Sequence, residues 1–166
     1  MNYGEVSSNI GNYGRAGGII GQFGGPCTVN RCINTGNVTG YQGAGGIVGW
    51  SGDSGGLVVN HSYNNAAIHA SNGDAGGIEQ GAYNQTSSYS LNAGEVSCAA
   101  DKTAYRIGKG TITSCYYYDG ATLKDNSGNE AGDIDATVAT LNTGLQTAFW
   151  GKDGSTIKPL SLIDNQ

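Results

Sequence analysis

A stretch GGIIG at residues 17–21 decides the fold of this 166-residue chain, because it recurs as GGIVG at 45–49 and as GGIEQG at 76–81. A fourth copy, RIGKG at 106–110, keeps the isoleucine but lacks the glycine pair. The isoleucines of the four copies lie 28, 31 and 29 residues apart, at Ile19, Ile47, Ile78 and Ile107. Repetition at a nearly constant spacing is typical of a repeat protein, in which each copy forms one structural unit.

Two further columns of residues keep the same register through the four copies. The first column consists of apolar residues, Val6, Val38, Ile68 and Val96. The second consists of small residues, Cys32, Ser62, Ser90 and Cys115. Each copy is predicted to form three short extended pieces separated by polar, glycine-rich corners. One copy cannot bury its apolar face alone, whereas copies stacked about 4.8 Å apart can. The sequence predicts a mainly β fold, a parallel β-solenoid (β-helix) of about four Gly-rich coils with a small C-terminal helical cap.

A glycine pair precedes the isoleucine in each of the first three copies. The pairs are Gly17–Gly18, Gly45–Gly46 and Gly76–Gly77. We expect a corner at each pair, which requires either a positive φ or an approach of neighbouring backbones so close that a Cβ would obstruct it. Tyr105–Arg106 replaces the pair in the fourth copy, so we expect that corner to change shape, as in a terminal coil.

These copies resemble the GLUG-motif repeats, which are named for a Gly-Leu-(any)-Gly core. The resemblance covers residues 2–118, with Ile in place of the usual Leu of the family, an exchange that nearly conserves side-chain volume. Such repeats are similar to those in large bacterial surface proteins, including the non-catalytic parts of immunoglobulin A1 peptidases. The resemblance implies a solenoid in an extracellular, cell-surface or secreted protein, and it implies no reaction.

Residues 119–166 no longer follow the repeat, and we interpret them as a C-terminal cap on a solenoid domain of residues 1–118. Residues 119–132 are polar and are expected to form a surface loop. The next stretch, 133–148, has apolar residues at helical spacings: Ile134, Val138, Leu141 and Leu145. Gly144 favours an earlier end of this helix. We expect the helix to cover the open end of the solenoid, where unpaired strand edges would invite aggregation.

The charge pattern excludes two classes of partner. Eight Lys and Arg are scattered singly against 13 Asp and Glu, which gives a net charge of −5. Nucleic acids and anionic membranes both need a basic face, so we expect neither as a partner. The sequence contains no run of eighteen apolar residues, so we expect no membrane insertion of this segment. The opening MNYGEVSSN lacks the features of a signal peptide. If the parent protein is secreted, we expect its signal upstream of this segment.

One string matches a catalytic motif. GDSGG at 52–56 surrounds the nucleophile of chymotrypsin-like serine proteases, with Ser54 in the position of the nucleophile. That mechanism requires a histidine base, which precedes the serine in those proteases, and a buried aspartate to orient it. His61 and His69 both follow Ser54. We therefore expect no catalytic triad, because a motif does not transfer without its structural context.

The four cysteines are expected to be free structural thiols. Cys32 and Cys115 share a column but lie three coils apart, about 14 Å at the usual strand spacing, which is beyond disulfide reach. No Cys/His spacing suggests zinc, and Glu130 stands where an EF-hand loop beginning at Asp125 needs glycine. We expect no metal and no other cofactor.

Exposed aromatic rings can stack on sugars. The leading candidates for such a site are Tyr41, Trp50, Tyr63 and Tyr83, and Tyr89 and the tyrosine run 116–118 are further candidates. The alternative is that these rings fill the column ends and corners. A carbohydrate-cleaving solenoid needs paired carboxylates. Glu5 and Glu95 occupy the same column, but Asn37 and Ala67 lie between them, so the two carboxylates form no pair.

We therefore expect no enzyme, but a structural or adhesive module of a larger secreted or cell-surface bacterial protein. Its expected partners are a host glycan or protein and the flanking domains of its own chain. The alternative is a carbohydrate-binding or carbohydrate-cleaving β-helix domain.

Overall fold

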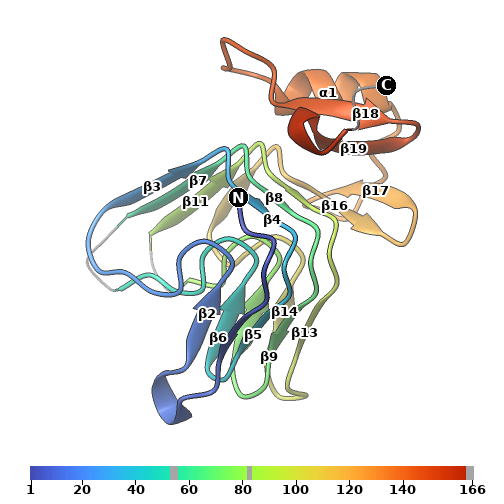
Figure 1. Cartoon of the computed structure of the whole chain (residues 1–166). Helices are drawn as coiled ribbons and strands as arrows, with labels where there is room; N and C mark the ends of the chain where they lie inside the picture. The colour runs from blue at the N-terminus through green and yellow to red at the C-terminus, as the bar shows by residue number, and fades with distance from the viewer. Residues whose placement is uncertain (53–55, 82–83, 164–166) are drawn as a thin grey trace.

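The computed structural model describes residues 1–52, 56–81 and 84–163. These residues confirm the predicted fold: a mainly β chain coils about four times into a parallel β-solenoid and is followed by a short helix. Figure 1 shows the coils stacked side by side, each following the path of the one before it. Equivalent strands of successive coils are neighbours, so every parallel sheet runs along the stack.

In the described residues each coil contributes one strand to each of four parallel sheets, one strand more than the three extended pieces expected per copy. The first sheet contains β1 (Val6–Ser8), β5 (Val38–Gly40), β9 (Ile68–Ala70) and β13 (Val96–Cys98). The second contains β2 (Arg15–Gly17), β6 (Gly43–Gly45), β10 (Asp74–Gly76) and β14 (Ala104–Tyr105). The third contains β3 (Cys27–Asn30), β7 (Leu57–Asn60), β11 (Gln85–Ser88) and β15 (Thr111–Thr113). The fourth contains β4 (Ile33–Asn34), β8 (Tyr63–Asn64), β12 (Leu91–Asn92) and β16 (Tyr116–Asp119).

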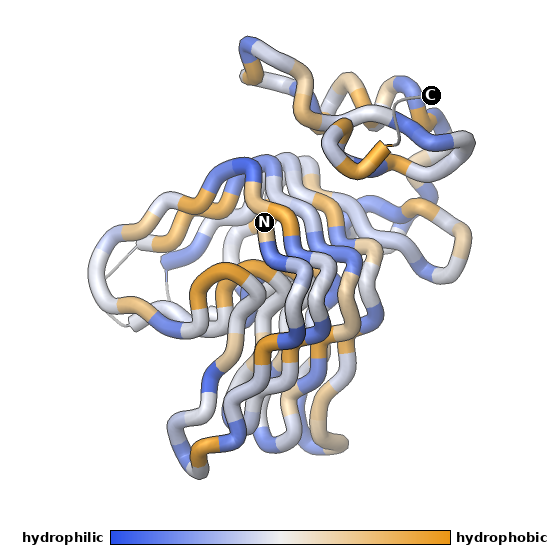
Figure 2. Tube along the Cα trace, in the orientation of Figure 1, coloured by the Kyte–Doolittle hydropathy of each residue, from blue (hydrophilic) through white to orange (hydrophobic). Residues whose placement is uncertain are grey.

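The apolar columns occupy the register that the repeat predicts. The column of the first sheet pairs residue with residue, as Val6–Val38–Ile68–Val96. The isoleucines after the corners meet in a second core cluster, Ile19, Ile47, Ile78 and Ile107. Figure 2 shows hydrophobic positions of neighbouring coils lying side by side along the stack. The core is thus a set of columns that each coil extends by one side chain.

An asparagine ladder runs beside these columns. Asn2 Nδ2 donates to Asn34 Oδ1 at 2.7 Å, and the same bond joins Asn34 to Asn64 and Asn64 to Asn92 at 2.8 Å each. The three later asparagines are buried, so the ladder satisfies amides that would be costly to bury unpaired. These asparagines open the four copies in the sequence, but their role is visible only in the structure.

The glycine pairs are explained by this ladder and by the tight corner beside it. A Cβ on Gly46 would overlap the Asn64 side chain and the Gly77 carbonyl, and one on Gly45 would overlap the Val48 carbonyl. None of the six glycines of the pairs, all of which are described, has a positive φ. Close approach is therefore the reason for glycine here. The stack is not interrupted at Tyr105–Arg106, since Gly77 N donates to the Tyr105 carbonyl at 3.0 Å.

A left-handed residue precedes each member of the small-residue column. These residues, with φ of 54°, 49°, 50° and 49°, are Arg31, His61, Tyr89 and Ser114. The small side chain that follows donates to the carbonyl two residues before it, as Ser62 Oγ does to Asn60 at 3.0 Å and Cys115 Sγ does to Thr113 at 3.5 Å. A short hydrogen-bonding side chain holds each of these corners, and both Ser and Cys can supply it.

The chain after the fourth coil forms a strand, a helix and a hairpin. β17 (Thr122–Asp125) pairs antiparallel with β16 and extends the fourth sheet, within a stretch that was expected to be only a loop. α1 (Ile134–Leu141) begins after its N-cap Asp133 and ends before Gly144, as the shorter alternative predicted. β18 (Trp150–Asp153) and β19 (Thr156–Pro159) form the hairpin. Two short 3₁₀ turns, η1 (Gly11–Tyr13) and η2 (Leu160–Leu162), complete the elements of the described residues.

The C-terminal unit, residues 133–163, packs on the outer face of the fourth sheet. Outward side chains of β4, β8 and β12 form one core cluster with α1, β18 and β19. Trp150 is 1% exposed and meets Tyr63 edge to face, with ring centroids 5.9 Å apart. We expected this unit over the open end of the stack, whereas it lies along the side (Figure 1). The physical reason is that the outward face of this sheet is itself apolar and needs a cover.

Candidate functional site

The aromatic residues proposed from the sequence lie in separate places. Tyr63 is 1% exposed beneath Trp150, so its ring belongs to the core and has no free face for a ligand. Trp50 is half-buried, and the Arg15 guanidinium lies 3.9 Å from its ring centroid. Tyr41 is half-buried in the turn between β5 and β6, and Tyr83 lies outside the described residues. Tyr63, Trp50 and Tyr41 therefore form no shared platform for sugar stacking.

The histidines make structural contacts. His61 stacks on Tyr89 with ring centroids 5.1 Å apart, and its Nε2 lies 3.1 Å from the Thr143 carbonyl oxygen of the C-terminal unit. Burial lowers the pKa of His61. His69 Nδ1 lies 2.9 Å from Ser97 Oγ on an exposed strand. Ser54 of the GDSGG string lies outside the described residues.

The four cysteines are free, and neither the buried Cys115 nor the half-buried Cys32 is an activated thiolate. Burial raises the pKa of Cys115 to about 12 and raises that of Cys32 as well. The described part of the chain holds no cluster of three or more His, Cys, Asp or Glu that could bind a metal ion. Asp125 Oδ1 accepts the N–H groups of Ser127 and Asn129 at 2.8 and 3.0 Å, so this oxygen holds its own loop together.

Glu79 is a fully buried carboxyl group inside the third coil. It occupies the column of Ile20 and Val48, where the first two coils carry apolar side chains, and this place in the column was the sequence signal for its burial. Its Oε1 accepts the Gly110 N–H at 3.1 Å, whereas Oε2 has no partner in the described residues. Burial raises the pKa of Glu79 to about 8, so the carboxyl is protonated at neutral pH. A glycosidase needs two carboxyl groups facing one substrate, and Glu79 is enclosed in the stack.

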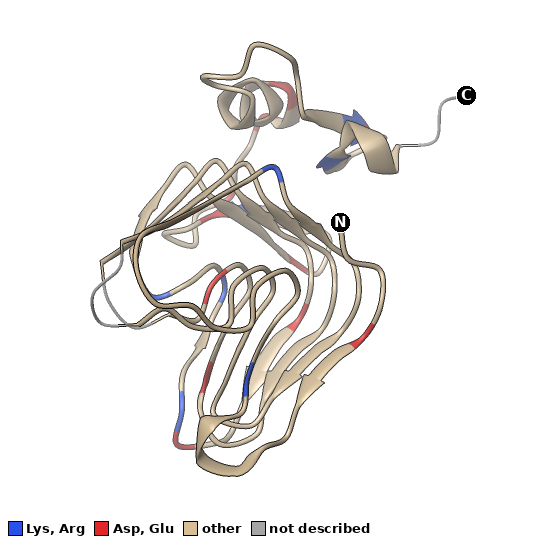
Figure 3. Ribbon diagram, turned by 60° about the vertical axis from the view of Figure 1, so that its left-hand side comes forward, with Lys and Arg blue, Asp and Glu red and all other residues tan. Residues whose placement is uncertain are grey.

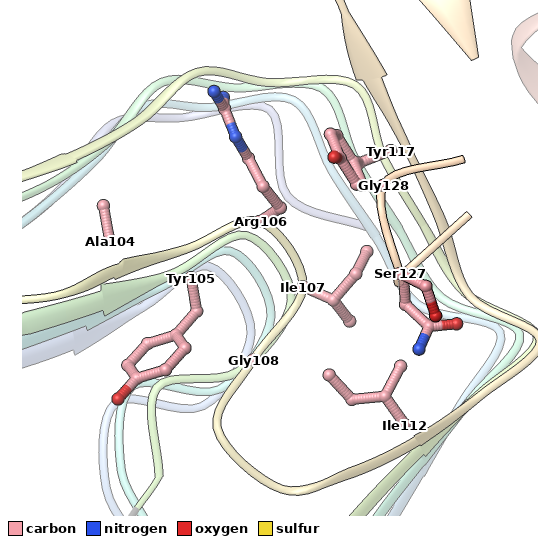
Figure 4. Close-up of a pocket in the computed structure, with 10 residues that line it drawn as sticks. Ala104, Tyr105, Arg106, Ile107, Gly108, Ile112, Tyr117, Ser127 and Gly128 are labelled. Carbon is pink, nitrogen blue, oxygen red and sulfur yellow. The ribbon is translucent and has the colours of Figure 1, made fainter. Parts of the chain in front are cut away.

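A hollow of about 310 Å³ lies at the end of the fourth coil. We call it the end hollow, and it is lined by residues 104–108, Ile112, Tyr117 and the loop 126–128. Figure 4 shows Ile107 and Ile112 close together, with Tyr117 and Ser127 beside them and with the side chains of Tyr105 and Arg106 at the edge. Since Ile107 ends an apolar column, the hollow lies where a further coil would place its inward side chains.

Arg106 stands between the end hollow and a second hollow of about 320 Å³, which is lined by Glu95 and Asp119 among others. Its guanidinium carbon lies 5.7 Å from the Tyr117 ring centroid. Within the described residues the ion pairs are all of lysine with aspartate, so none involves Arg106. Figure 3 shows the other charges scattered over the coils. Tyr117 belongs to the aromatic run 116–118 that the sequence analysis named, whereas Arg106 was missed, although the loss of the glycine pair at 105–106 was a signal.

Comparison of the chain with family models, with curated proteins and with solved structures gave no match. In the residues that the structure describes, every helix is too short or too polar to cross a membrane.

Proposed function

We propose that this chain is a non-catalytic structural or adhesive module of a larger secreted or cell-surface bacterial protein. The observation that carries the proposal is the contact of the glycine pairs with the asparagine ladder. These contacts commit the repeated residues to stacking one coil on the next. A stack of this kind grows by a constant rise per coil, which suits a stalk or an elongated binding face. The resemblance to GLUG-motif repeats supports the same location and role.

Binding and turnover assays test this proposal together. The purified chain would be applied to arrays of glycans and of host surface proteins, and each glycan that binds would then be incubated with the chain and examined for products. Binding without turnover indicates an adhesin, and the absence of both indicates a spacer. Cleavage of a glycan that is lost on changing a single carboxyl, as in Glu95→Gln, would overturn the non-catalytic assignment.

The second candidate function is carbohydrate binding, and the end hollow favours it. Its volume of about 310 Å³ and its combination of apolar, aromatic and charged side chains suit one sugar ring. Tyr117→Ala in the array experiment tests this candidate, with Tyr13→Ala as the control because Tyr13 is 78% exposed and lies in the first coil. Loss of a glycan signal in the first variant alone supports the candidate. Equal signals from both variants would argue against it.

A further inference from the structure

Three successive backbone N–H groups face the next coil at the same corner of each coil. In the first coil the N–H groups of residues 18–20 donate to the second coil at 3.2, 3.0 and 3.0 Å, the last two to the same Ile47 oxygen. Residues 46–48 donate to the third coil in this pattern and share the Ile78 oxygen, and residues 77–79 share the Ile107 oxygen of the fourth. The three N–H groups of each corner therefore bind carbonyl oxygens of the next coil, and we call such a set of three donors the receptor.

Residues 106–108 hold this position in the fourth coil. Their backbone follows the path of the third coil, because Gly76 pairs with Tyr105 and Ile78 N donates to Ile107 O at 2.7 Å. Within residues 1–52, 56–81 and 84–163, the N–H groups of Arg106, Ile107 and Gly108 have no acceptor. Ile107 and Gly108 are buried residues that line the end hollow, so an acceptor for their N–H groups has to lie in that hollow. The pattern requires an oxygen atom in the end hollow, which these three residues line.

The charge at this receptor differs from that of the other coils. The position of Arg106 is a glycine in each of the first three coils, where the acceptors are neutral carbonyl oxygens. The Arg106 side chain lines both the end hollow and the neighbouring hollow, so its guanidinium adds a positive charge at the edge of the receptor. Of the nearby acids, Glu79 is buried and protonated, Asp125 is bonded within its loop, and Glu95 and Asp119 line the neighbouring hollow. Successive N–H groups beside a cation favour an oxyanion over a neutral oxygen.

We propose that the end hollow binds a carboxylate, held by the N–H groups of residues 106–108 and by the Arg106 guanidinium. The apolar floor of Ile107 and Ile112 and the Tyr117 ring would contact the carbon skeleton of the ligand. The volume of about 310 Å³ suits a single acidic sugar residue, a uronate. The carboxylate site goes beyond the proposed function, since a spacer needs no ligand, and its saccharide part rests on the second candidate function.

Amide NMR on the ¹⁵N-labelled full chain tests the proposal, with titrations of sodium acetate, sodium glucuronate and glucose at constant ionic strength. We expect saturable shifts of the amide signals of residues 106–108 with both carboxylates, a lower Kd for glucuronate, and no shift with glucose. Arg106→Gln should raise the Kd about tenfold, the loss of one charge-assisted hydrogen bond. Arg31→Gln removes the same charge from a distant corner and should leave the Kd unchanged. Arg106→Lys should recover part of the affinity.

The arms of the experiment separate the parts of the proposal. Equal affinity for acetate and glucuronate would support the carboxylate site and overturn its saccharide part. Shifts at 106–108 no larger than elsewhere, or an unchanged Kd in Arg106→Gln with an otherwise native spectrum, would overturn the site itself. Neither result would contradict a structural role for the stack, because the array and turnover assays test that role independently.

Discussion

At the scale of single residues, this protein is organised by polar groups that it buries. Asn64 is fully buried, and its side chain takes part in four hydrogen bonds, which join it to Asn34, to Asn92 and to the backbone of Ala66. The positions beside the ladder require glycine, because a Cβ there would overlap the asparagine side chain and the backbone of the next coil. A polar ladder of this kind fixes the register, since a shift by one residue would leave every amide unpaired.

Replacing Asn64 should weaken the whole stack. We expect Asn64→Ala to lower the free energy of unfolding by about 2–4 kcal/mol, because it leaves ladder atoms of Asn34 and Asn92 unpaired in the interior. Urea denaturation followed by circular dichroism measures the change. Asn65→Ala is the matched control, since Asn65 is the exposed neighbour and should cost less than about 0.5 kcal/mol. Similar losses in both variants would refute the role of the ladder.

Glu79 should make the stability fall as the pH rises. Its pKa is raised from 4.5 to about 8 in the folded chain, so the folded state binds more protons than the unfolded state between these values. Stability is then greatest below pH 4.5 as far as this group is concerned, and it declines up to about pH 8 by at most about 1.4 kcal/mol per pH unit. Denaturation midpoints across this range, compared with Glu79→Gln, isolate the effect. An identical pH slope in the variant would disprove it.

At the scale of elements, the fourth sheet is the only one of the described sheets whose outer face is covered by the C-terminal unit. Its strands are two to four residues long, and they alternate an outward apolar residue with an inward asparagine in β4, β8 and β12. The sequence predicted α1 and its early end because apolar spacing and Gly144 are local signals. It could not predict where the helix docks, because the sequence pattern does not show whether Ile33, Tyr63 and Leu91 point into the solenoid or out of it.

Loss of the central ring of this contact should release the C-terminal unit. Trp150 is 1% exposed and touches both Tyr63 and Phe149, at centroid distances of 5.9 and 5.0 Å. We expect Trp150→Ala to destabilise the unit by about 3–5 kcal/mol. Hydrogen exchange should quicken in α1 and β18 and remain slow in β7 and β11. Leu160→Ala, at a side chain that is 47% exposed, is the control and should change little. Equal acceleration in β7 would show that the solenoid and the unit unfold together.

At the scale of the whole molecule, the coils and their register were predictable, and the features at the end of the stack were not. Val6, Val38 and Ile68 recur in sequence because one inward position recurs in space. The receptor at 106–108 depends on donors of the backbone, which no residue type reveals. β17 escaped prediction because TLKD has too little apolar character to indicate a strand, and its pairing with β16 comes from the sheet edge already present.

Removal of residues 133–163 together with the residues that follow them should cause aggregation. The deletion exposes the outward apolar face of β4, β8 and β12, which the C-terminal unit covers. Size-exclusion chromatography of the truncated chain should show large species, and adding Leu91→Lys to the same truncation should reduce them. A truncated chain that remains monomeric and folded would contradict this assignment of the unit.

The asparagine ladder also gives the stack a direction. All three Nδ2 groups donate towards the later coil, so the side-chain amide dipoles point the same way along the axis. The two faces of the stack are therefore unlike: the side of Asn2 offers an amide oxygen, and the side of Asn92 offers an amide hydrogen. Coils of this type can pair their asparagines only when they stack head to tail, because each amide hydrogen then meets an amide oxygen of the next coil. The asparagines therefore exclude reversed stacking.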